Sequence, residues 1–192
     1  MAHKSIDVGY QNITISGKIA TGTTTLAKNL QNALHWKYVN AGELQRKYDR
    51  THNIHENKRG ATARSDSHEK GIDELTRSTL SNEQGLIYEA WLSGFVTRDM
   101  DNIFRVLVVC SEPDIIIDRV VNRENISIAD AKEWIGRREQ ENIDKWRMLY
   151  GKYNFWDPRY YSLVIDTYKL GPMESLGRVL DTLGVKNGIG TV

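Results

Sequence analysis

The stretch "NITISGKIATGTTTLAKNL" (residues 12–30) constrains the fold more than any other part of the sequence. A short β-branched run is followed by glycines at positions 17 and 22. Apolar residues then recur at Leu26, Ala27 and Leu30, the spacing of one helix face. A strand that turns through glycines into a helix N-terminus gathers free backbone N–H groups and the positive end of the helix dipole at one point. The stretch therefore predicts a phosphate-binding loop within an α/β chain.

The loop has the spacing of G-x-x-x-x-G-K-[ST], but Thr23 stands where the lysine belongs. Thr24 occupies the position of the hydroxyl that binds Mg²⁺. We expect the donor phosphates to be held by Gly17, Lys18, Ala20, Thr21, Gly22, Thr23, Thr24 and Thr25. Lys18, or arginines elsewhere, would supply the missing cation. The alternative is a Gly-Thr turn that caps a helix and binds no ligand.

Four more apolar runs predict strands, at residues 37–40, 86–89, 104–110 and 162–167. Most are continuous rather than alternating, which is typical of a parallel sheet covered by helices on both faces. A chain of 192 residues fits one domain, which we place at residues 11–192. We expect loose tails at 1–10 and 187–192.

Three arginines fall on two consecutive predicted helices. Arg119 and Arg123 lie one turn apart on a helix that begins at Pro113, and Arg138 lies in the apolar stripe of a helix capped by Ser127. An inward arginine needs an anionic partner, because burying it unpaired is costly. The partner would be Glu89 or Asp118 in a structural salt bridge, or else a polyphosphate. On the second reading, Lys18, Arg119, Arg123 and Arg138 would neutralise a phosphoryl group in transfer.

Composition bears on whether the protein binds nucleic acid, membranes or metals. The formal charge of +1 gives no global attraction to nucleic acid, although residues 46–70 carry seven Lys or Arg and three His against four acids. This segment is either a solvated surface or an anion site. The sequence shows no apolar run of about 20 residues and no signal-peptide pattern, so we expect a cytoplasmic protein without membrane contact. The histidines have no metal-binding spacing, and the single cysteine, Cys110, reads as a core thiol.

With these features placed, the chain resembles the nucleoside monophosphate kinases, and among them the archaeal-type cytidylate kinases. The stretches that carry the resemblance are "ITISGKIATGTTTLAKNL", "VNAGELQRKY", "IDELTR", "RVVNRENISIADA", "RREQENIDKWRMLYG" and "LVIDT". The resemblance implies a P-loop NTPase of the adenylate-kinase-like three-layer fold, with a five-stranded parallel sheet. Its core would span 11–41, 81–122 and 139–186, with a monophosphate-binding insertion at about 42–80 and a short lid at about 123–138.

The resemblance also implies an activity, the ATP- and Mg²⁺-dependent phosphorylation of CMP or dCMP. Thr24 would hold the metal. The acceptor would be held by Gly42, Arg46, Arg77 and Glu89. Its partners would be small nucleotides only, and the protein would be a monomer or weak dimer.

One departure leaves the acceptor open. The family usually has E-G-R after the third strand, where this chain has Glu89, Ala90 and Trp91. The alternatives are a kinase for another nucleotide or small metabolite, and a nucleotide-binding regulatory protein with a degenerate acceptor site.

Overall fold

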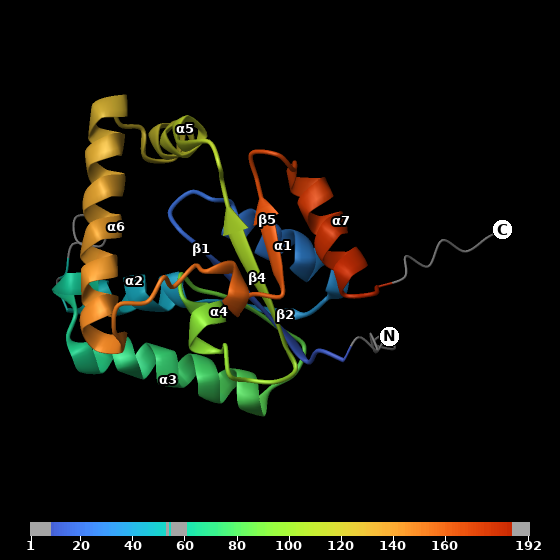
Figure 1. Cartoon of the computed structure of the whole chain (residues 1–192). Helices are drawn as coiled ribbons and strands as arrows, with labels where there is room; N and C mark the ends of the chain where they lie inside the picture. Colours follow the sequence, from blue (N-terminus) through green and yellow to red (C-terminus); the bar gives the residue numbers. More distant parts are fainter. Residues whose placement is uncertain (1–8, 53, 55–60, 186–192) are drawn as a thin grey trace.

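The computed structural model describes residues 9–52, 54 and 61–185. Its centre is a five-stranded parallel sheet in the order β2-β3-β1-β4-β5 (Figure 1). The strands are β1 (Asn12–Gly17), β2 (Lys37–Asn40), β3 (Leu86–Glu89), β4 (Ile103–Val109) and β5 (Leu163–Asp166). All five predicted strands are confirmed, with ends that differ by at most one residue.

One face of the sheet is covered by α1 (Thr23–Leu34) and α7 (Pro172–Thr182), which contact each other. The apolar stripe of α1 is buried as predicted, with Leu26 and Leu30 packed against Ile13 and Ile15 of β1. Burial of such side chains contributes about 1.5–3 kcal/mol each. Tyr10 also packs against this core, with its ring 5.1 Å from that of Phe104. The expected N-terminal tail is therefore shorter than residues 1–10, and its remainder lies outside the described residues, as does the tail at 187–192.

After β2 the chain forms α2 (Ala41–Thr51), the 3₁₀ turn η1 (Ala61–Ala63) and α3 (Asp66–Asn82). A buried ion cluster ties these elements together: Arg64 donates to Asp49 at 2.7 and 2.8 Å and to Glu69 at 3.5 Å. Arg64 and Asp49 are both almost fully buried. Much of segment 46–70, for which the sequence left open a solvated surface or an anion site, is thus a structured unit.

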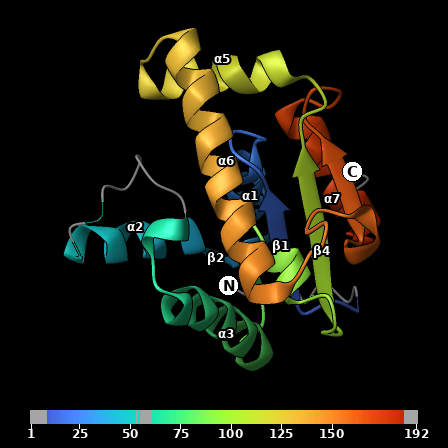
Figure 2. The ribbon, with the colours of Figure 1, turned by 60° about the vertical axis from the view of Figure 1, so that its left-hand side comes forward.

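The remaining helices are α4 (Ser93–Val96), α5 (Pro113–Glu124), α6 (Ile128–Tyr150) and η2 (Pro158–Tyr160). Ser127 caps α6 as predicted, accepting a hydrogen bond from the Asp130 N–H at 3.1 Å. Figure 2 shows α6 running from α5, past the sheet, down to α3. Residues of α2, α3, α5 and α6, which are far from the loop in sequence, are thereby brought over the carboxyl ends of the strands. In the described part of the chain, no helix is both long and apolar enough to span a bilayer.

Candidate active site

Two cavities meet at the phosphate loop. The first, of about 410 Å³, lies between the loop, α2, α3, the end of β3 and α6. The second, of about 500 Å³, lies between the start of α1, α5 and the segment after β5. Both are lined by Ala20, Thr23, Thr24 and Arg123. A group bound at the loop is therefore accessible from both cavities.

The loop requires its glycines. A Cβ at position 17 would lie 2.6 Å from the Thr21 hydroxyl and the Val108 carbonyl, so only glycine fits. Gly22 has φ 102°, a left-handed conformation that side chains disfavour. The Thr21 hydroxyl closes the turn by donating to the Lys18 carbonyl at 3.0 Å. The phosphate-loop geometry is thus present without the lysine.

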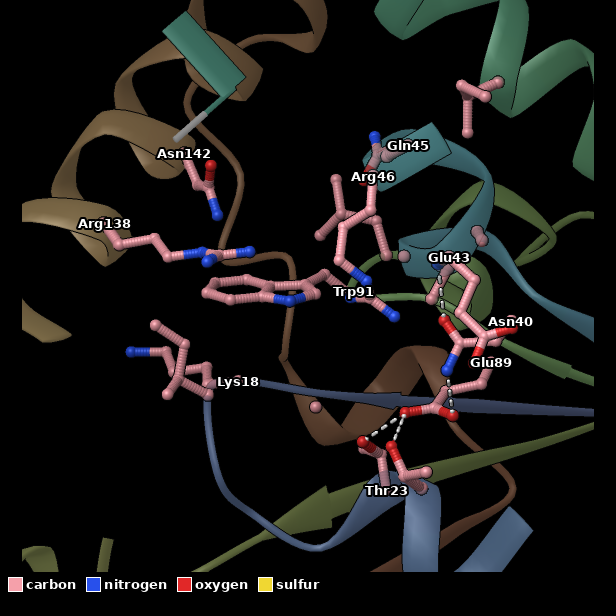
Figure 3. Close-up of a pocket in the computed structure, with 18 of the residues that line it drawn as sticks. Lys18, Thr23, Asn40, Glu43, Gln45, Arg46, Glu89, Trp91, Arg138 and Asn142 are labelled. Atoms are coloured by element: carbon pink, nitrogen blue, oxygen red, sulfur yellow. Dashed lines mark hydrogen bonds between the residues drawn. The ribbon is translucent and has the colours of Figure 1, made fainter. Parts of the chain in front are cut away.

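Glu89 stands at the end of β3 and accepts four hydrogen bonds, and Figure 3 draws those from Thr23 and Asn40. Thr23 and Thr24 each donate to Oε1 at 2.7 Å. Asn40 donates to Oε2 at 2.9 Å, and Tyr38 donates to the same oxygen. Burial and the neighbouring Glu89 raise the pKa of Tyr38, so its hydroxyl keeps the proton it donates. Thr23 therefore orients the strand-end carboxylate.

The oxygens of Thr24 and Glu89 suit Mg²⁺, which prefers hard oxygen ligands and is usually held by few protein groups together with phosphates. Among the described residues, no group of three or more His, Cys, Asp or Glu side chains could hold a metal.

Lys18 does not point its charge at the loop. Its ammonium pairs with Glu139 of α6 at 3.0 Å and lies 5.1 Å from the centre of the Trp156 ring. The lysine that the sequence offered as a replacement cation is held by a carboxylate instead.

Arg46 and Arg138 both line the first cavity, and neither forms an ion pair with a described residue. The Nε of Arg138 is buried without a hydrogen-bond partner in the described structure. Burial and the charges of Arg64, Arg123 and Arg46 lower the pKa of Arg138 to about 10. The alternative salt bridge with Glu89 or Asp118 is not formed, so a cation faces the cavity without its anion.

The other predicted arginines are placed differently. Arg123 lines both cavities, pairs with Glu124 at 2.7 Å and lies 5.8 Å from the Trp134 ring. Arg119 lines only the second cavity, where it donates to the Ala20 carbonyl and to the Thr167 hydroxyl, each at 3.0 Å. It fixes the loop to the end of β5.

Arg77 is outside both cavities. It donates to Asp99 at 2.6 Å and to the Val96 carbonyl at 2.6 Å, and its side chain is 41% exposed. The structure thus does not bring Arg77 to the cavity that Gly42, Arg46 and Glu89 line. Gly42, by contrast, lines the first cavity, where a Cβ would lie 3.3 Å from an Arg46 nitrogen.

Several cavity residues were not anticipated. Asp73 and Glu69 lie four apart on α3, and Trp134 and Trp146 add aromatic faces to that of Trp91, which the sequence had singled out. The i, i+4 spacing of the two acids was visible in the sequence. Their direction was not, because it depends on how α3 packs. Cys110 is half-buried, not a core thiol, and borders a third cavity of about 460 Å³ between α5 and α6.

Known proteins are similar to this chain in sequence and in fold. The model of the cytidylate kinase-like family matches residues 12–169. A cytidylate kinase from Thermococcus sibiricus is 31% identical over 164 residues, which cover 83% of this chain and 81% of that protein. An uncharacterised protein from Eubacterium ventriosum superposes with a TM-score of 0.68 at 15% identity, covering 92% of this chain and 99% of the other. A gluconokinase from Sinorhizobium meliloti gives a TM-score of 0.60 at 9% identity, with coverages of 92% and 93%.

Proposed function

The chain belongs to the cytidylate kinase-like family, and from that premise we propose that it transfers the γ-phosphoryl group of ATP to CMP or dCMP. The observation that carries the proposal is the pair of cavities that share Ala20, Thr23, Thr24 and Arg123. Direct transfer between two substrates requires donor and acceptor to meet at one place, in line. A cavity on each side of a phosphate loop provides that arrangement.

ATP would occupy the second cavity, with its base beside Arg119 and the segment 167–175 and its phosphates on the loop amides. Thr24 and Glu89 would hold Mg²⁺, which neutralises charge on the phosphates when bound. The monophosphate would occupy the first cavity, its phosphate held by Arg46.

Arg123 and Arg138 would stabilise the charge that develops during transfer, since both face the cavity side of the loop. Because Lys18 is paired with Glu139, we favour the arginines over Lys18 as the source of the positive charge that the loop lysine usually supplies. No residue of the chain needs to act as a nucleophile, because an oxygen of the acceptor phosphate attacks directly.

The test incubates the protein with ATP, Mg²⁺ and one acceptor at a time, and separates the products by chromatography. Conversion of CMP or dCMP to the diphosphate with equal ADP formation supports the proposal. Turnover of another monophosphate, or of gluconate, would replace it with a different kinase activity. ATP binding without turnover of any acceptor would indicate a regulatory protein.

A matched pair of arginine variants tests the acceptor site. We expect Arg46→Met to raise the KM for the monophosphate at least tenfold, because a charge-assisted phosphate contact is lost. Arg77→Met should leave this KM unchanged, because its partner is Asp99 at the surface.

A further inference from the structure

The first cavity differs at its two ends. Near the loop it is cationic, with Arg46 and Arg138 lacking anionic partners among the described residues. Away from the loop it is bounded by α3 and by the indole of Trp146, and the indole of Trp91 lies between the two ends. If the acceptor phosphate lies at the cationic end, the rest of the acceptor faces α3 and these rings.

Trp91 is held rigidly. Its ring centroid lies 5.6 Å from that of Trp146 and 6.3 Å from that of Trp156, and its carbonyl accepts a hydrogen bond from the Trp156 indole N–H at 3.2 Å. In Figure 3 the indole lies between Arg46 and Arg138, in the middle of the cavity. A fixed aromatic face of this kind is suited to stacking on a planar ring.

Asp73 offers one carboxylate oxygen at this end. Its Oδ2 accepts from the Tyr150 hydroxyl, whereas no described residue donates to Oδ1. The neighbouring Glu69 is fully engaged, with Oε1 near Arg64 at 3.5 Å and Oε2 accepting from the Trp146 indole N–H at 3.2 Å. An ionised carboxylate can only accept hydrogen bonds, so the free oxygen favours a donor group and repels a carbonyl.

We infer that Trp91 and Asp73 form the base-recognition end of the acceptor site, where Trp91 stacks on the base and Asp73 accepts a hydrogen bond from its exocyclic amino group. Cytosine presents an amino group where uracil presents a carbonyl oxygen. The site therefore selects an amino-bearing base. The inference rests on the proposed function for its placement of the phosphate, and it deepens that function by assigning the selectivity.

Ionisation supports this assignment. Burial and the nearby Glu69 raise the pKa of Asp73, and the hydrogen bond from Tyr150 lowers it in part. The resulting pKa is about 6. Asp73 is thus mostly ionised at pH 7.5, the state in which it accepts only.

Equilibrium binding tests the inference independently of turnover. CMP and UMP are titrated into wild-type protein and variants at pH 7.5, and Kd is measured by calorimetry. Asp73→Asn is nearly isosteric. Its carbonyl can take the Tyr150 hydrogen bond, which leaves the NH₂ group to donate to a carbonyl. Glu74→Gln, at the next and exposed position of α3, is the matched control for charge.

We expect wild-type protein to bind CMP at least about tenfold more tightly than UMP. CMP gains one hydrogen bond to Asp73, whereas the carbonyl oxygen of UMP is repelled by the same carboxylate. Asp73→Asn should abolish or invert this ratio, and Glu74→Gln should keep it. Trp91→Leu should weaken both nucleotides by a similar factor of about tenfold, because stacking does not distinguish the two pyrimidines.

Equal binding of CMP and UMP, binding of neither, or an unchanged ratio in Asp73→Asn would overturn the inference. Selective CMP binding that depends on Asp73 would uphold it even if no phosphoryl transfer were observed. In that case the proposed function alone would fail.

Discussion

At Arg138, a single residue is expected to lower the stability of the free protein and to contribute to activity. Its guanidinium is subject to the charges of Arg64, Arg123 and Arg46 and lies 5.2 Å from the centre of the Trp134 ring, and its Nε is buried without a hydrogen-bond partner in the described structure. Such a group destabilises the free protein and is stabilised once an anion arrives. We expect Arg138→Met to raise the free energy of unfolding by about 1 kcal/mol while lowering kcat about 100-fold.

Urea unfolding and steady-state kinetics check both parts. The control is Arg137→Met, since Arg137 lies next to it on α6 but pairs at the surface with Glu133 at 3.6 Å. If Arg138→Met were less stable than wild type and equally active, Arg138 would be a structural residue.

Lys18 is the second residue whose role can be decided by a single substitution. Its ammonium is engaged by Glu139 in a partly exposed pair, and such pairs contribute about 0–1 kcal/mol. We expect Lys18→Ala to change kcat less than about threefold, within what the loss of such a pair allows. The kcat is measured in steady-state assays. A much larger decrease in kcat, with an unchanged free energy of unfolding, would mean that Lys18 leaves Glu139 and contacts the phosphates.

At the scale of elements, α6 contains a glycine that no contact explains. A Cβ at Gly136 would meet no atom within 4 Å, and the residue lies in the interior of a 23-residue helix. We expect Gly136→Ala to stabilise the protein by about 0.5–1 kcal/mol, because alanine loses less backbone entropy in a helix. Thermal unfolding measures this. A lower Tm would show that the glycine serves a bend or a closure of α5 against α6.

Helices α2 and α3 depend on one buried ion cluster. Asp49 of α2 is the bidentate partner of Arg64, and their side chains are 1% and 7% exposed. We expect Asp49→Ala to cost about 3 kcal/mol or more, because it leaves a buried guanidinium with only the longer contact to Glu69.

Limited proteolysis should then cut within residues 41–82 before it cuts the strands, and urea unfolding gives the free-energy cost. The matched surface variant is Asp99→Ala, which breaks the exposed pair with Arg77 and should cost less than about 1 kcal/mol. Similar costs for the two variants would contradict the importance of the cluster.

For the whole molecule, Asp73 links stability to pH. Its pKa is raised from 3.8 to about 6 in a site shared with Glu69 of α3, Tyr88 of β3 and Tyr150 of α6. The folded protein therefore binds this proton more tightly than the unfolded chain. The contribution of Asp73 to stability is most favourable below pH 4 and declines as pH rises to about 6.

We expect the Tm of Asp73→Asn, relative to wild type, to rise between pH 4 and pH 6 and to stay constant above. Taking the difference between the two proteins removes the effect of the other acids. A difference that is flat over this range would show that Asp73 has an ordinary pKa.

The sequence predicted the sheet and the loop well, because both depend on local order. Continuous apolar runs define the strands, and Gly17 and Gly22 are required by contacts and a φ value within the loop itself. The helix start at Pro113 and the cap at Ser127 were confirmed for the same reason. Arg77 lines neither cavity at the loop and pairs with Asp99, because a motif match does not say which way α3 presents a residue.

By itself, the sequence determined that this chain builds a parallel α/β sheet with a phosphate loop, because strand, turn and helix signals act over neighbouring residues. Only the tertiary structure decided which charges face that loop. Lys18 is paired with Glu139, 121 residues away, and Thr23 is hydrogen-bonded to Glu89, 66 residues away. Partners so distant in sequence are brought together by packing. Packing also leaves Arg138 without an anionic partner among the described residues, and this unpaired charge marks the place where an anionic substrate would bind.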